Sequence, residues 1–188
     1  FIVLLPPRCA STTIATLLQI HDPDGCLVEV KLKGVSHWHT FLRYAPIKDI
    51  TAYTVFLPHR EILDWAKSCF NNSKTHWSEE MNGVSFYDFV MKHKGIDLRQ
   101  GQNAPGFNWF IRAPTQLLLT NKGAKIQTKR ILYVRHDQLL KDLFIPLNRE
   151  FSIRIPPKIH KFNNSPDNTT PLNKKQHREV MGLLHQLV

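Results

Sequence analysis

The sequence predicts an α/β layered domain, in which strands and helices alternate along the chain. Its first five residues, FIVLL, form a continuous apolar run of strand length, which is typical of a central strand covered on both faces. A segment with helical spacing follows this run, and the same order recurs further along the chain. The length of 188 residues is enough for a sizeable core, so we expect one domain over residues 1–188.

The first half of the chain contains three expected strands and two expected helices. These are strands at 1–5, 27–32 and 51–57 and helices at 11–20 and 62–70. The strand at 51–57 (TAYTVFL) is rich in β-branched and aromatic residues. We expect Pro58-His59 to break this strand before the next helix begins.

Capping signals mark two helices in the second half of the chain. Ser85-Phe86-Tyr87-Asp88 resembles a capping box, and we expect Asn173 to cap a final helix. The apolar residues expected to face the core in these two helices are Phe86, Phe89, Val90, Val180, Leu183, Leu184 and Leu187. The other expected elements are a strand at 131–134, a following helix that contains Leu139, Leu140 and Leu143, a surface loop at 95–108 and an irregular segment at 155–172.

The charge balance favours anionic partners. The chain has 25 Lys and Arg against 15 Asp and Glu, a formal charge of +10, which suits phosphates, acidic glycans, nucleic acid or acidic lipid. Three scattered cysteines (Cys9, Cys26 and Cys69) indicate neither a disulfide framework nor a zinc site. No apolar run reaches membrane-span length, so we expect no membrane segment in this chain. We expect a cytoplasmic location if the chain is complete, and the Golgi lumen if an N-terminal anchor has been removed.

The loop after the first strand, PPRCASTT, is suited to hold an anion. A strand-to-helix turn presents backbone N–H groups at the positive end of the helix dipole. Ser11, Thr12 and Thr13 would add hydroxyl donors there, and Arg8 a fixed cation. The loop lacks the glycines and the Gly-Lys-Ser/Thr ending of a Walker A motif, so ATP with magnesium is not indicated. The alternative left open is an ordinary helix cap beside a solvated Arg8.

A second landmark lies in TVFLPHREILDWAKSCFN. Arg60 follows an expected strand, and Ser68 lies eight residues further on, two turns into the next expected helix. Arginine can give a phosphate two parallel hydrogen bonds, and serine can add a short third one. The alternative is an exposed arginine at a helix start and an ordinary helical serine.

The two landmarks, and their order along the chain, resemble those of the sulfotransferases that use 3′-phosphoadenosine 5′-phosphosulfate (PAPS). The first is similar to the family's phosphosulfate-binding loop. The resemblance implies that this donor is contacted by Pro7, Arg8, Cys9, Ala10, Ser11, Thr12 and Thr13. It also implies that Arg60 and Ser68 hold the 3′-phosphate of the nucleotide.

Weaker similarities extend the resemblance over nearly the whole chain. They lie in GVSHWHTFLRYAPIKDI, SFYDFV, APTQLLL and ILYVRHDQLLKDL, and they are closest to the branch that sulfates carbohydrates. The resemblance implies the P-loop-NTPase-like sulfotransferase fold, a three-layer α/β/α arrangement around a central, mainly parallel sheet. In it, Arg135, His136 and Asp137 are expected at a strand end near the same crevice.

The family's reaction moves a sulfuryl group from PAPS to a hydroxyl or amine, leaving adenosine 3′,5′-bisphosphate. The resemblance implies that Arg8, Thr12 and the loop N–H groups stabilise charge on the leaving phosphate, with no metal needed. The preferred general base is His39, with His37 as the alternative, since histidine is suited to proton transfer near neutral pH. The expected acceptor is a glycan or another hydroxyl compound, which includes acidic ones. We expect no nucleic acid as a partner. The sequence does not indicate the oligomeric state.

Four residues depart from the family pattern. Ala10 replaces a glycine, Arg8 a lysine, Ile62 a proline and Trp65 an arginine. These changes keep a second hypothesis open, a weakly active or inactive protein of the same fold that binds a nucleotide or an anionic polymer. A third hypothesis, a nucleic-acid-binding domain, rests on the positive charge and the scattered aromatic residues, and no recognition motif for nucleic acid supports it.

Overall fold

The structure, a computed structural model, describes residues 1–6, 8–21, 30–32, 35–37, 48–76, 78–79, 81–92, 118, 120, 122, 124–155, 167 and 169–186. The chain forms two compact units. The first comprises Phe1–Arg60 and Pro114–Asn163, and the second comprises Glu61–Ala113 and Asn164–Val188. The single domain expected from the length stays a prediction.

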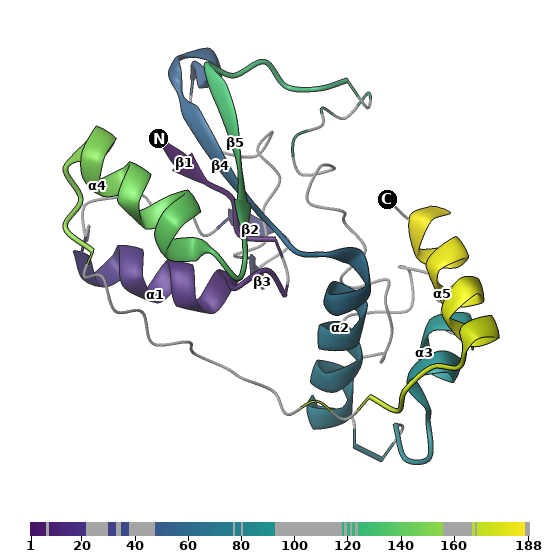
Figure 1. Cartoon of the computed structure of the whole chain (residues 1–188). Helices are drawn as coiled ribbons and strands as arrows, with labels where there is room; N and C mark the ends of the chain where they lie inside the picture. The colour runs from purple at the N-terminus through teal and green to yellow at the C-terminus, as the bar shows by residue number, and fades with distance from the viewer. Residues whose placement is uncertain are drawn as a thin grey trace. The chain divides into compact units, whose positions relative to one another are not determined.

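A small parallel sheet organises the first unit (Figure 1). Its strands are β1 (Ile2–Val3), β4 (Thr54–His59) and β5 (Arg130–Arg135), in the order β1-β4-β5. Both pairs are parallel, with Ile2 opposite Val55 and Thr54 opposite Arg130. The predicted α/β class is therefore confirmed at this level.

Helices cover one face of this sheet. They are α1 (Ser11–His21), a π-helix at Leu140–Phe144 and α4 (Ile145–Phe151). Phe56 and Val134 from the strands pack with residues of all three helices in one cluster of buried side chains. On the opposite face, Val55 and Leu57 pack with Leu4 and Leu118. Alternate residues of β4 thus enter two different clusters, as the period of two in a strand requires.

The predicted end of the third strand at Pro58-His59 is wrong, because both residues belong to β4. The backbone of Phe56 faces β1, since its carbonyl accepts a hydrogen bond from the Leu4 N–H. Backbone groups alternate along a strand, so the imide nitrogen of Pro58 faces the same side, where the last residue of β1 is paired with Phe56. The proline therefore removes no hydrogen bond from the sheet.

Two short strands form a separate sheet. β2 (Val30–Leu32) and β3 (Val35–His37) pair in antiparallel order, with Val30 opposite His37. β2 coincides with the end of the strand expected at 27–32, whereas β3 was not expected. The start of that expected strand and the loop expected at 95–108 lie outside the described residues.

Three helices make up the described part of the second unit (Figure 1). They are α2 (Ile62–His76), α3 (Phe86–Lys92) and α5 (Lys174–Gln186). The capping box is confirmed, since the Ser85 hydroxyl accepts from the Asp88 N–H at 3.0 Å and donates to its carboxylate. The cap at Asn173 is also confirmed, because its side-chain oxygen accepts from two N–H groups of α5.

Candidate functional site

The carboxyl ends of the three parallel strands place several predicted site residues at one edge of the first unit. β1 leads into the loop that carries Arg8, β4 is followed directly by Arg60, and β5 ends at Arg135. Parallel strands bring their carboxyl ends to the same edge of a sheet, and ligands of α/β folds bind beyond this edge. The two landmarks of the sequence therefore share one edge because β1 and β4 are neighbours.

Two residues of the loop have left-handed backbones. Arg8 and Ala10 both have a φ of 63°. Turns containing such residues line up successive N–H groups into a concavity that suits an anion. The Cys9 N–H closes the turn on the carbonyl of Pro6 at 3.3 Å, and the carbonyl of Ala10 accepts the first hydrogen bond of α1 from Ile14. The N–H groups of the first turn of α1, which begins directly after this loop, face the same edge.

The three hydroxyls of the loop do not act alike. The buried Ser11 hydroxyl donates to the carbonyl of Pro6 at 2.6 Å, and its predicted contact with an anion stays a prediction. This hydrogen bond uses the single proton of the hydroxyl and connects the start of α1 to the start of the loop. Thr13 is buried as well, whereas Thr12 is half-buried. Thr12 is therefore the hydroxyl of the three with the most access to solvent.

Arg60 reaches back to the loop. Its Nη1 atom donates to the carbonyl of Arg8 at 3.4 Å, across 52 positions of the sequence. Its Nε atom is buried and has no hydrogen-bond partner among the described residues. A buried N–H donor without a hydrogen-bond partner costs free energy. An anion at this edge would satisfy that donor.

Cys9, next to Arg8 in the loop, is fully buried. Burial raises the pKa of its thiol to about 12, although the charges of Arg60 and Arg8 act in the opposite direction. The thiolate is the nucleophilic form of cysteine. Cys9 is thus a packing residue of the loop rather than a nucleophile.

We expect Cys9 to react slowly with iodoacetamide in the folded protein, because it is protonated and inaccessible at pH 8.5. Peptide mapping by mass spectrometry after timed alkylation measures this, with the urea-unfolded chain as the control. The buried Cys69 should behave similarly. Rapid modification of Cys9 in the folded protein would contradict the closed loop described above.

We expect Ala10→Gly to stabilise the protein by about 1 kcal/mol, because a left-handed backbone is costly for alanine and not for glycine. Urea unfolding measures the change. Ala15→Gly in the middle of α1 is the matched control and should destabilise the protein by about 1 kcal/mol or more. A loss of stability in both variants would contradict the backbone conformation at position 10.

The roles of the other predicted site residues stay predictions. Ser68 lies on α2 in the second unit and is half-buried, so its pairing with Arg60 stays a prediction. His37 is the last residue of β3. Pro7 and His39 lie outside the described residues.

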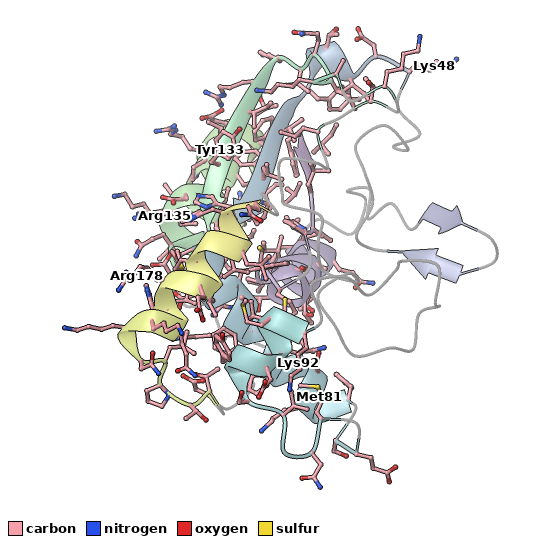
Figure 2. All side chains as sticks on the ribbon, turned by 90° about the vertical axis from the view of Figure 1, so that its right-hand side faces the viewer. Lys48, Met81, Lys92, Tyr133, Arg135 and Arg178 are labelled. Atoms are coloured by element: carbon pink, nitrogen blue, oxygen red, sulfur yellow. The ribbon has the colours of Figure 1, made fainter. Side chains whose placement is uncertain are left out.

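The end of β5 adds polar groups to the edge. The Asp142 carboxylate accepts from both the backbone N–H and the Nε of Arg135, at 3.3 and 3.2 Å. The N–H of His136 donates to the carbonyl of His59 at 2.9 Å. Asp142 and His59 lie within segments that carry the resemblance, but the sequence assigned neither residue a role, because strand pairing and the helix after β5 bring them here. Tyr133 and Arg135 lie two positions apart at the end of β5 (Figure 2).

Among the described residues, no group of three or more His, Cys, Asp or Glu side chains is arranged to hold a metal ion. No helix described in the structure combines the length and the apolar character needed to cross a membrane. No protein-family model, curated protein or solved structure matches this chain.

Proposed function

We propose that the protein is a sulfotransferase that moves the sulfuryl group of PAPS to a hydroxyl or amine of a carbohydrate or related acceptor. The P-loop-like sulfotransferase fold, with helices on both faces of the parallel sheet, is part of the same proposal. One observation carries it, the hydrogen bond from Arg60 to the carbonyl of Arg8. This bond joins the two landmarks that the sequence shares with that family.

The residues at the edge of the first unit fit a phosphorylated donor. Two guanidinium groups, Arg8 and Arg60, lie close enough to Cys9 to act on the pKa of its thiol. The buried Nε of Arg60 has no hydrogen-bond partner among the described residues. The left-handed loop and the start of α1 add N–H donors to this positive charge. Such a set of donors matches an anion with several oxygens.

When bound, PAPS supplies the sulfuryl group, whose bond to the phosphate oxygen breaks as the bond to the acceptor oxygen forms. Arg8 and the N–H groups of the loop would stabilise the negative charge that collects on the departing phosphate. Such preorganised donors contribute roughly 3–4 kcal/mol each in other enzymes. Thr12 would add a hydroxyl donor to the same oxygens. The acceptor's proton passes to a base, for which His39 or His37 is the proposed residue.

A second candidate function is nucleotide or anionic-polymer binding without chemistry. The backbone at Ala10 favours this candidate, since alanine occupies a left-handed position that suits glycine. The side-chain methyl group lies where the family's loop has none. Binding and transfer therefore need separate measurements.

A calorimetric titration of the full chain with adenosine 3′,5′-bisphosphate tests the proposal. If a separate 3′-phosphate site exists, this ligand should bind at least roughly tenfold more tightly than adenosine 5′-monophosphate, since a charge-assisted hydrogen bond is worth about 1.5–3 kcal/mol. Equal affinities for the two nucleotides would refute the proposed 3′-phosphate site and with it the assignment of PAPS as the donor. Transfer of radiolabelled sulfate from PAPS to a panel of glycans then separates the two candidates: tight binding without transfer supports the second.

A further inference from the structure

The exposed side of α5 carries a row of basic residues that the proposed site does not use. The helix sequence KKQHREVMGLLHQ contains a single acidic residue, Glu179. Lys174, Lys175, Arg178 and His185 are all exposed, and we refer to these four residues as the α5 basic face. With 3.6 residues per turn they lie on neighbouring positions of one side of the helix. Arg178 is labelled on α5 in Figure 2, on its solvent-exposed side.

The Glu179 side chain is hydrogen-bonded to a residue of α3 and offsets little of the positive charge of this face. Its Oε2 atom accepts a hydrogen bond from the Tyr87 hydroxyl at 2.6 Å. This hydrogen bond raises the pKa of Tyr87, so the phenol keeps its proton and remains a donor. The other oxygen of Glu179 is 3.9 Å from the ammonium of Lys175, a loose contact of exposed groups. Lys174 and Arg178 face no carboxylate of their own helix.

The apolar side of α5 is already occupied. Val180 and Leu184 are fully buried, and α5 packs against α2 and α3. A helix that binds a membrane surface needs its apolar side free to enter the lipid. The α5 basic face also contains no Phe, Tyr or Trp side chain on which a base could stack. A flexible polymer with repeated carboxylate or sulfate groups is the partner that this surface fits best.

We propose that the α5 basic face docks an acidic glycan, as a surface in addition to the nucleotide site. The rise of 1.5 Å per residue places Lys174 and Arg178 about 6 Å apart along the axis, and His185 about 10 Å further on. A glycan chain with an anionic group on successive sugars can contact several of these residues at once. The choice of a glycan over other polyanions rests on the proposed function, which takes a carbohydrate acceptor.

The test is binding of a sulfated glycosaminoglycan oligosaccharide to the full chain, measured by calorimetry at fixed salt. The variant Lys174→Gln/Lys175→Gln/Arg178→Gln should bind roughly tenfold more weakly, since it removes three exposed ionic contacts. The control Lys122→Gln/Lys125→Gln/Lys141→Gln removes the same charge from exposed lysines of the first unit and should change affinity by less than about twofold. Equal losses in both variants would overturn the proposal, because only the total charge would then matter.

Two further ligands decide the class of partner. A neutral dextran should not bind, and a short DNA duplex should bind more weakly than the glycan at the same salt concentration. A duplex that binds as tightly, and loses affinity in the α5 variant, would assign the surface to nucleic acid and overturn the choice of a glycan.

Adenosine 3′,5′-bisphosphate should bind the α5 variant with the same affinity as the wild type. A chain that binds the glycan through α5 but does not bind this nucleotide would keep the docking surface and refute the proposed function.

Discussion

Arg60→Ala should weaken the binding of adenosine 3′,5′-bisphosphate roughly a hundredfold. The guanidinium of Arg60 can give a phosphate two hydrogen bonds, and losing such a charge-assisted pair costs about 3 kcal/mol. The variant also removes the bond from Arg60 to the Arg8 carbonyl, which links β4 to the loop. Both effects act in the same direction. Calorimetric titration of the variant and the wild type measures the change.

Two control variants make this result specific. Arg149→Ala removes one exposed cation from the same unit and should leave the affinity nearly unchanged. Arg60→Lys keeps the charge but loses the forked geometry, so it should fall between the wild type and Arg60→Ala. Thermal unfolding of each variant shows whether the fold is intact. Equal affinity of wild type and Arg60→Ala would refute the placement of the nucleotide.

Phe56→Ala should destabilise the protein by about 3–5 kcal/mol, a large part of the stability of an ordinary domain. Phe56 is fully buried on β4 and belongs to the cluster between the sheet and the helices. Its ring lies edge-on to Phe1 and Phe151, each at 6.3 Å between centroids. Truncation would leave a cavity at the centre of the first unit. Urea unfolding followed by circular dichroism measures the loss.

Tyr133→Ala is the matched control for Phe56→Ala. Tyr133 is an aromatic residue on the neighbouring strand β5, but 52% of its surface is exposed. Its removal should cost less than about 1 kcal/mol, since an exposed side chain leaves no cavity. Similar losses for the two variants would contradict the core described for the first unit.

Local signals of the sequence predicted the helices well. α1 begins at Ser11 as expected, and the capping box at Ser85 and the cap at Asn173 form the expected hydrogen bonds. Caps and helical spacing act within a few residues, so the sequence contains most of the information needed. Val180 and Leu184 are buried for the same reason, because the spacing of apolar residues defines the inner side of α5.

Longer-range relations were less predictable. Pro58 can continue the strand because its imide nitrogen faces the side of β1, and β1 ends before it reaches this position. Only the order of the strands in the sheet reveals this. The Ser11 hydroxyl is taken by a carbonyl five residues earlier, which depends on the path of the loop. Asp142 reaches Arg135 because the helix after β5 turns back to the strand end.

By itself the sequence determined the α/β class, the main helices with their caps, and the positions of Arg8 in the loop after one strand and of Arg60 directly after another. Only the tertiary structure decided that these arginines meet, through the parallel pairing of β1 and β4 and a hydrogen bond across 52 positions. It also decided that Cys9 is a buried, protonated packing residue whose thiol feels the charges of both arginines. The physical reason is that caps and periodicity depend on neighbouring residues, whereas strand order, burial and the charge around a side chain depend on segments distant in the sequence.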